Sequence, residues 1–223
     1  MLYRTWLKLK PTDDLLWQTI QTHHRHWSGS LPVSVQWRIF VEELCRVLLN
    51  ALYNGESCVI SLPAVSGTDL RVEVDRSYLE YMWMVFLHAT GNPLCVTQAA
   101  VFETQMECLC TQVELMVNHN CNGEVILRVF KNLTMCVVVP NHRKFEKGIA
   151  RAVSALVTIF RDTYDVTTFT SASLHTLYHA MAYALASESE LVLHASLVGL
   201  TRLLEVPFDG IQILAKTALY AIN

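Results

Sequence analysis

The chain has 223 residues, of which 52% are hydrophobic and 17% charged, and its formal net charge is −3. This composition excludes an intrinsically disordered chain, because such chains are poor in apolar residues and rich in charge. The balance of 17 basic and 20 acidic residues argues against a nucleic-acid binder with a positively charged surface. The low charge indicates either a large core or an apolar surface that a partner covers.

Seven irregularly spaced cysteines, an odd number, argue against a disulfide framework. The first residues, MLYRTWLKLKPTDD, lack the apolar run of a secretory signal peptide. We therefore expect an intracellular protein, cytoplasmic or nuclear, whose thiols are mostly buried. Two stretches without Asp, Glu, Lys or Arg, Tyr81–Phe102 and Val166–Ser187, are long enough to span a bilayer. Gly91-Asn92-Pro93 interrupts the first and the second is amphipathic, so we predict no membrane span.

The N-terminal part is predicted to mix helices and strands. Alternation near the end of residues 2–9 favours a strand, and Thr12 or Asp13 is a suitable cap for a helix that runs to about residue 27. The periodicity of residues 33–53 predicts a strong amphipathic helix. Two apolar or alternating segments, 58–62 and 70–75, predict a hairpin, and a helix over 77–88 follows.

The remaining chain is predicted to be mostly helical. The predicted helices cover residues 96–118, 143–163, 171–187, 189–205 and 208–222. Residues 124–130 and 134–139 are rich in β-branched side chains and predict a second hairpin, followed by a loop at Pro140-Asn141. No internal repeat is visible. The last three helices recur at about 20 residues, whereas helix-pair solenoids repeat at about 33–47, so a solenoid is the less favoured alternative.

Together these elements predict an α+β, mainly helical fold. We expect about seven helices around a small antiparallel sheet of four or five strands, with an all-helical C-terminal layer. The length fits a single globular domain, 1–223. Within it, residues 1–140 and 141–223 are candidate sub-layers, the first α+β and the second all-helical.

The first candidate site is a histidine pair, His175 and His179. Two histidines at i and i+4 on a helix can bind one metal ion, as in zinc helices. Thr176 occupies the position of the glutamate in the zinc-protease motif, and a third ligand would have to come from elsewhere, such as His194 or Glu188. The alternative is that both histidines border the apolar stripe of a helix.

The cysteines provide further candidates. Cys136 and His142 suggest a thiol nucleophile with a base, and the alternative is a buried, inert thiol. Residues of the types that bind zinc also cluster in the sequence. However, Cys108 and Cys110 are at positions i and i+2 of a predicted helix and point about 200° apart, so they cannot both face one ion. This cluster comprises Cys108, Cys110, His119 and Cys121.

A basic cluster opens the helix predicted at 143–163. It could contact phosphate groups, and the alternative is an ordinary solvated helix face. Its members are Arg143, Lys144, Lys147 and Arg151.

All five tryptophans lie in the N-terminal part of the chain, and Trp83 is the last of them. Tryptophan is enriched at the centres of protein interfaces because it removes a large area from water and keeps one polar group. Four of them are therefore candidate protein-binding residues, and the alternative is that they fill the N-terminal core. These four are Trp17, Trp27, Trp37 and Trp83.

The sequence contains no P-loop, dinucleotide-binding, nucleophile-elbow or zinc-protease motif. We therefore expect a non-catalytic interaction subunit or adaptor within a larger complex, without a cofactor. Its partner would be another protein, or a second copy in a homo-oligomer. The alternative is a small metal-dependent or thiol enzyme that uses His175 and His179 or a cysteine.

Overall fold

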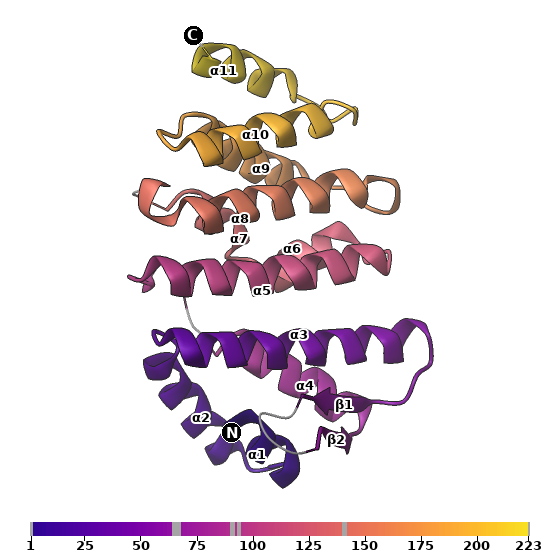
Figure 1. Ribbon diagram of the computed structural model, residues 1–223. Coiled ribbons are helices and arrows are strands. Elements are labelled where there is room, and N and C mark those ends of the chain that lie inside the picture. Colours follow the sequence, from indigo (N-terminus) through magenta and orange to yellow (C-terminus); the bar gives the residue numbers. More distant parts are fainter. Residues whose placement is uncertain (1, 64–67, 90–91, 93–94, 140–141, 223) are drawn as a thin grey trace. The chain divides into compact units, whose positions relative to one another are not determined.

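The computed structural model describes residues 2–63, 68–89, 92, 95–139 and 142–222 (Figure 1). Those residues are mainly helical with one small antiparallel sheet, which confirms the predicted class. Gly91, Pro93, Pro140, Asn141 and residues 64–67, which belong to the predicted connection between the two strands, lie outside them. The chain divides into two compact units, residues 1–92 and 93–223. The expected single domain stays a prediction, because compactness does not test independent folding.

In its described residues, unit 1 contains four helices, with a two-stranded hairpin between the last two. The elements are α1 (Leu2–Leu9), α2 (Asp14–Trp27), α3 (Leu31–Tyr53), β1 (Val59–Leu62), β2 (Leu70–Glu73) and α4 (Arg76–Leu87). The two strands pair antiparallel, with Ile60 opposite Val72. The side chain of Asp13 caps α2 by accepting a hydrogen bond from the Leu15 amide at 2.8 Å, as the sequence predicted.

The core of unit 1 forms where α3 packs on α4 and β1, and it is rich in aromatic side chains. Trp37 is fully buried, and its indole N–H donates to the carbonyl oxygen of Phe86 at 2.7 Å. Phe40 and Phe86 meet edge to face with ring centroids 5.0 Å apart, and Tyr3 stacks on Phe40 at the same distance.

The expected strand at residues 2–9 is wrong, because this segment is the helix α1. Tyr3 and Leu7 are four residues apart and both are buried, which is a helical spacing. Leu9, which suggested alternation with Leu7, is 69% exposed. The helix is stabilised by the apolar face that it packs into unit 1.

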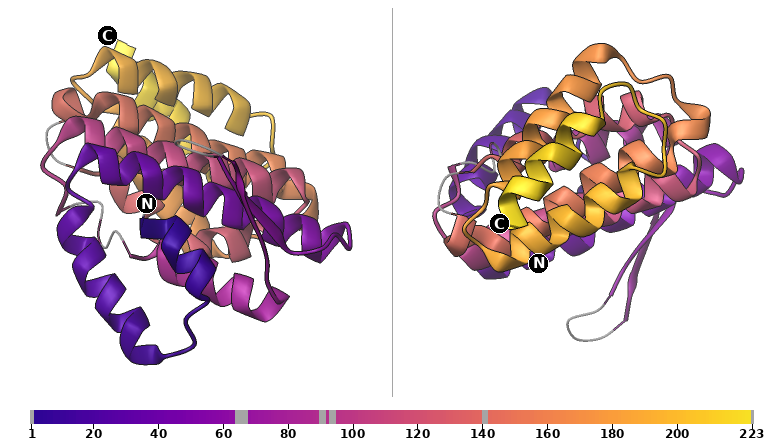
Figure 2. Two further views of the ribbon diagram at one scale, coloured as in Figure 1. Left: turned by 60° about the horizontal axis from the view of Figure 1, so that its bottom comes forward. Right: turned by 90° about the horizontal axis from the view of Figure 1, so that it is seen from above.

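Unit 2 is all-helical in the residues that the structure describes. Its elements are α5 (Ala99–Asn118), α6 (Gly123–Val129), α7 (Leu133–Val137), α8 (His142–Asp162), the 3₁₀ turn η2 (Tyr164–Val166), α9 (Ser171–Leu185), α10 (Glu190–Leu203) and α11 (Gln212–Ile222). They form two layers. Helices α5, α8 and α10 pack side by side in one layer, and α7, α9 and α11 pack in the other (Figure 2).

The hairpin predicted at 124–130 and 134–139 is wrong, because these segments form α6 and α7. The side chain of Asn122 caps α6 by accepting from the Glu124 amide at 3.0 Å. The buried apolar residues recur at spacings of four, three and four, which is the signature of a helix rather than a strand. They are Ile126, Phe130, Leu133 and Val137.

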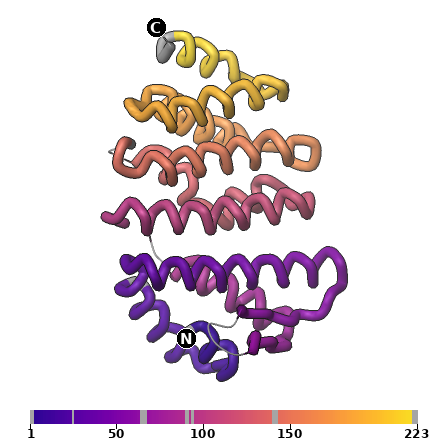
Figure 3. The backbone as a smooth tube through the Cα atoms, in the orientation of Figure 1, coloured from indigo at the N-terminus to yellow at the C-terminus, as the bar shows by residue number. Residues whose placement is uncertain are grey.

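The layers of unit 2 are built from stacked helix pairs (Figure 3). In the first layer, α5 begins at Ala99, α8 at His142 and α10 at Glu190. Successive helices of this layer thus start roughly 45 residues apart, near the upper end of the range of about 33–47 residues at which helix-pair solenoids repeat. Unit 2 is therefore a stack of helix pairs, the arrangement that its sequence favours less. The shorter spacing noted between the last helices corresponds to half of one structural repeat.

Among the described residues, no helix combines the length and hydropathy that crossing a bilayer requires.

Candidate functional site

The tryptophans named as protein-binding candidates lie mostly in the core. Trp17, Trp37 and Trp83 are 3%, 0% and 6% exposed, so as positioned they offer little area to a partner. Trp17 also donates its indole N–H to the Pro11 carbonyl oxygen at 3.1 Å. Trp27 is 42% exposed and stacks on His23, which makes it the one member of this set that reaches the surface.

The histidine pair lies on the exposed side of α9. His175 and His179 are both exposed, and His194 lies on a different helix, α10. Across the described residues, no three His, Cys, Asp or Glu side chains come together in a way that could hold a metal ion. The geometry therefore favours the alternative interpretation, in which these histidines flank an apolar stripe.

The cysteines are mostly buried thiols, as expected, and five of the seven are buried. Cys108 and Cys110 are both buried, although positions i and i+2 of a helix point in different directions. Burial raises the pKa of Cys110 and of Cys136 to about 12. These two thiols stay protonated near pH 7, so they are poor nucleophiles there. Cys136 lies on α7 and not on the expected strand.

The basic cluster of α8 is largely used within unit 2. Lys147 pairs with Glu103 at 3.9 Å, Arg151 with Glu107 at 3.5 Å, and Arg143 pairs with the carboxylate of Glu188. The first two pairs link α8 to α5 at positions four residues apart along each helix. Carboxylates thus already neutralise three of the four cations that could contact phosphate. The fourth, Lys144, lies over the ring of Phe145.

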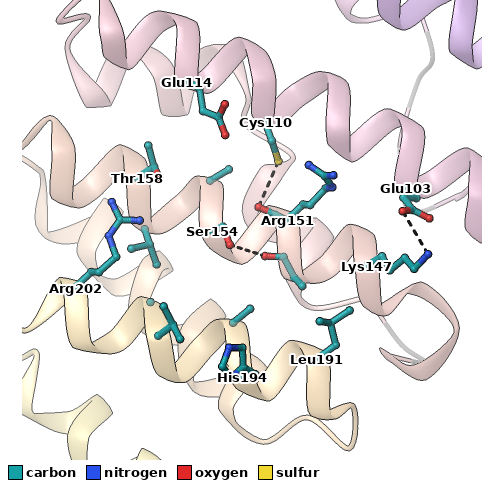
Figure 4. A pocket seen from close by; sticks show the side chains of 16 residues that line it. Glu103, Cys110, Glu114, Lys147, Arg151, Ser154, Thr158, Leu191, His194 and Arg202 are labelled. Carbon is teal, nitrogen blue, oxygen red and sulfur yellow. Dashed lines mark hydrogen bonds and ion pairs between the residues drawn. The ribbon is translucent and has the colours of Figure 1, made fainter.

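A groove that the sequence analysis did not find crosses the outer face of α5, α8 and α10 (Figure 4). Its volume is about 560 Å³, and it is partly open to solvent. Its lining comprises Glu103, Cys110, Glu114, Lys147, Ala150, Arg151, Ser154, Ala155, Val157, Thr158, Leu191, His194, Ala195, Val198, Gly199 and Arg202.

Small residues of α8 and α10 make the floor of the groove. Gly199 is required at the closest approach of these helices, because a Cβ atom there would lie 2.7 Å from Cγ2 of Val157. Ser154 turns its hydroxyl back to the Ala150 carbonyl oxygen at 3.0 Å, so it presents little polarity to the groove. The floor is therefore lined by small side chains, and Gly199 allows α8 and α10 to approach closely.

Leu191 and Val198 give the groove exposed apolar surface. They are 41% and 48% exposed and lie on α10, seven residues apart and therefore on the same face. In Figure 4, Leu191 and His194 extend from α10 at the lower side of the groove. Apolar residues in such a setting mark a surface suited to binding another apolar surface.

Charges of both signs border this apolar strip. On the α10 side, Arg202 pairs with Asp162 of α8 at 3.0 Å. On the α5 side, Cys110 donates its thiol proton to the Arg151 carbonyl oxygen at 3.3 Å, which fixes α5 against α8. Lys147 and Arg151 of α8 pair with Glu103 and Glu107 of α5, so a carboxylate matches each of these two cations as well. The arrangement suits recognition by shape and apolar contact.

The groove has no local motif because its residues come from three helices that are far apart in the sequence. The sequence gives one indication of this surface: α10 is apolar on nearly all sides. That pattern predicts a helix enclosed by other helices. Leu191 and Val198 are instead on the surface.

The chain is similar to a Rap-GAP domain-containing protein of Dictyostelium discoideum. The two are 22% identical over 222 residues, which is 100% of this chain and 14% of the length of that relative. The chain thus spans about a seventh of the curated relative that it matches. No protein-family profile matches the chain, and no solved structure matches it.

Proposed function

We propose that this chain is a non-catalytic protein-interaction unit that works as part of a larger protein or complex. The observation that carries the proposal is the groove across α5, α8 and α10, with its floor of small residues and its exposed Leu191 and Val198. Its partner is a polypeptide segment, helical or extended, that places apolar side chains on this floor.

The stacked helix pairs of unit 2 support this role. Helix-pair solenoids present long continuous faces, because each pair contacts only its neighbours and the stack leaves one side of every helix open. The groove lies along such a face and collects side chains from three successive helices of one layer.

The similarity to part of a larger protein also supports the proposal. The matched region makes up 14% of a Rap-GAP domain-containing protein, so a segment similar to this chain occurs there beside a great deal of further chain. We infer that the present chain likewise contributes binding surface to an assembly.

The alternative of a metal-dependent or thiol enzyme gains less support. His175 and His179 are exposed on α9, and the described residues bring no third metal ligand to them. Cys110 and Cys136 are buried, and their raised pKa values keep both thiols protonated near pH 7.

The test compares partner capture by the full chain and by a groove variant. The double variant Leu191→Glu and Val198→Glu places two charges on the apolar strip, and both positions are exposed, so the fold should persist. The matched control, Leu15→Glu with Leu52→Glu, changes two exposed leucines of unit 1. We expect at least a tenfold loss of co-purifying protein or of self-association for the groove variant alone. Equal capture by both variants would refute the groove as the binding surface.

A further inference from the structure

A second cleft of unit 2 lies away from the groove, at the turns that follow α8 and precede α11. Its volume is about 450 Å³. The residues that give it its chemical character are Tyr164, Asp165, Phe169, Phe208 and Asp209. Three of them are aromatic and two are carboxylic acids, and the lining contains no basic side chain.

The aromatic rings of this cleft are arranged around Phe208. Tyr164 meets Phe208 nearly perpendicularly with ring centroids 5.2 Å apart, and Phe169 meets it at 6.0 Å and 70°. Tyr164 and Phe169 are both half-buried, and one face of Phe169 is already covered by the stacked ring of Phe160, whose centroid lies 4.4 Å away. Aromatic faces carry negative potential, and several of them around one cleft attract a cation.

Asp165 and Asp209 add net negative charge to the same cleft, and both are exposed. They come from different turns, one in η2 and the other before α11. The negative charge of Asp209 also contributes, after burial, to the raised pKa of Tyr178. The cleft thus combines aromatic and carboxylate groups, and both kinds of group favour a cationic ligand.

Hydrogen bonds hold both turns in place. The Tyr178 hydroxyl donates to the carbonyl oxygen of Asp209 at 2.7 Å, and Gly210 follows with a φ of 82°, which favours glycine. On the other turn, the Thr167 hydroxyl oxygen accepts from the Gly123 amide at 2.7 Å. A cleft that is already ordered loses little entropy when it binds a ligand.

We propose that this cleft binds an arginine side chain from a partner polypeptide. A planar guanidinium can stack on the Tyr164 ring while its N–H groups donate to the carboxylates. This site would bind a charged side chain through aromatic and carboxylate groups that do not line the groove. The proposal is therefore independent of whether the groove binds an apolar segment.

The test uses nuclear magnetic resonance of the full ¹⁵N-labelled chain with the capped peptide Gly-Gly-Arg-Gly-Gly as the probe. We expect saturable shifts of the amides at 164–169 and 208–209. The same peptide with citrulline, which keeps the shape of arginine without its charge, should bind at least fivefold more weakly. Equal binding of the two peptides, or absence of shifts at these amides, would overturn the proposal.

Variants separate the contributions of the two kinds of groups. Asp165→Asn with Asp209→Asn should weaken the arginine peptide at least fivefold, and Tyr164→Leu should weaken it about threefold. The matched control, Asp69→Asn with Glu80→Gln, removes two exposed acids of unit 1 and should leave binding unchanged. Circular dichroism confirms that each variant folds. Full binding by the double aspartate variant would exclude the cleft as the site.

Discussion

His24 shows how one residue can make the stability of unit 1 depend on pH. Its side chain is fully buried, and a hydrogen bond of 2.5 Å joins the Tyr3 hydroxyl oxygen and Nε2 of His24. Burial lowers the pKa of His24 to about 4, against an ordinary value of 6.5. The unfolded chain therefore binds a proton more readily than the folded chain between these two values.

The first prediction follows from this difference. The contribution of neutral His24 to stability is essentially complete above its ordinary pKa and is lost as the pH falls, by about 2 kcal/mol between pH 7 and pH 5. Urea unfolding at both pH values measures it. His24→Gln, which cannot titrate, should remove this part of the pH dependence, whereas His23→Gln, at an exposed position, should retain it. An unchanged pH dependence in His24→Gln would contradict the argument.

The second prediction concerns Trp37, whose indole N–H satisfies the Phe86 carbonyl oxygen inside the core. Trp37→Phe leaves that carbonyl without its donor and removes part of the packed ring, so we expect a loss of about 1–3 kcal/mol in the free energy of unfolding. Trp27→Phe, at a half-exposed position, should change it by less than about 0.5 kcal/mol. Chemical denaturation of both variants provides the comparison, and equal effects would show that Trp37 is not a core residue.

At the scale of elements, most helices could be predicted because their apolar stripes are long. The helices 31–53, 99–118 and 142–162 begin and end within a few residues of their predicted bounds. The prediction of strands in the segment 123–137 was wrong. Its β-branched residues favour a strand locally, but the packing of its buried residues onto α8 favours a helix. Short helices of this kind are decided by tertiary contact more than by propensity.

The third prediction tests the close packing of α8 and α10. Gly199→Val would place side-chain atoms where Cγ2 of Val157 lies, so we expect a loss of about 1–3 kcal/mol in the free energy of unfolding. Thr201→Val, which places the same side chain at an exposed position of the same helix, should have little effect. Urea unfolding of the two variants measures the difference.

A double-variant cycle identifies the contact itself. Val157→Ala combined with Gly199→Val should be less destabilising than the sum of the two single changes by about 1 kcal/mol, because the smaller residue makes room for the larger one. Strict additivity would mean that the two helices do not meet at these positions.

At the scale of the whole molecule, the candidate site could not be predicted from the sequence. Its residues share no spacing along one helix, and they come together only because α5, α8 and α10 pack side by side. The basic cluster of α8 was a candidate phosphate site because the carboxylates that pair with it could not be located from the sequence. Its acidic partners Glu103 and Glu107 lie on α5, far earlier in the sequence, and become its neighbours only in the fold.

The fourth prediction concerns the salt dependence of binding. Cations that line the groove are paired with carboxylates, as in Lys147 with Glu103 and Arg202 with Asp162, so an apolar segment gains little from long-range attraction. Raising the salt concentration from about 0.05 M to about 0.5 M should therefore change partner capture by less than about twofold. The arginine peptide at the second cleft should weaken at least threefold over the same range. A tenfold loss of partner capture would show that charge, and not apolar contact, holds the partner.

The central claim is that partners bind in the groove across α5, α8 and α10. The most direct measurement places a photo-crosslinking amino acid at Val198 in the groove, and at Leu52 in unit 1 as a control. Both side chains are 48% exposed, so exposure alone cannot explain a difference between them. We predict that the Val198 position forms a discrete crosslinked species in the protein's own cells and that Leu52 does not. Crosslinking of equal yield and pattern at both positions, or none at Val198, would contradict the claim.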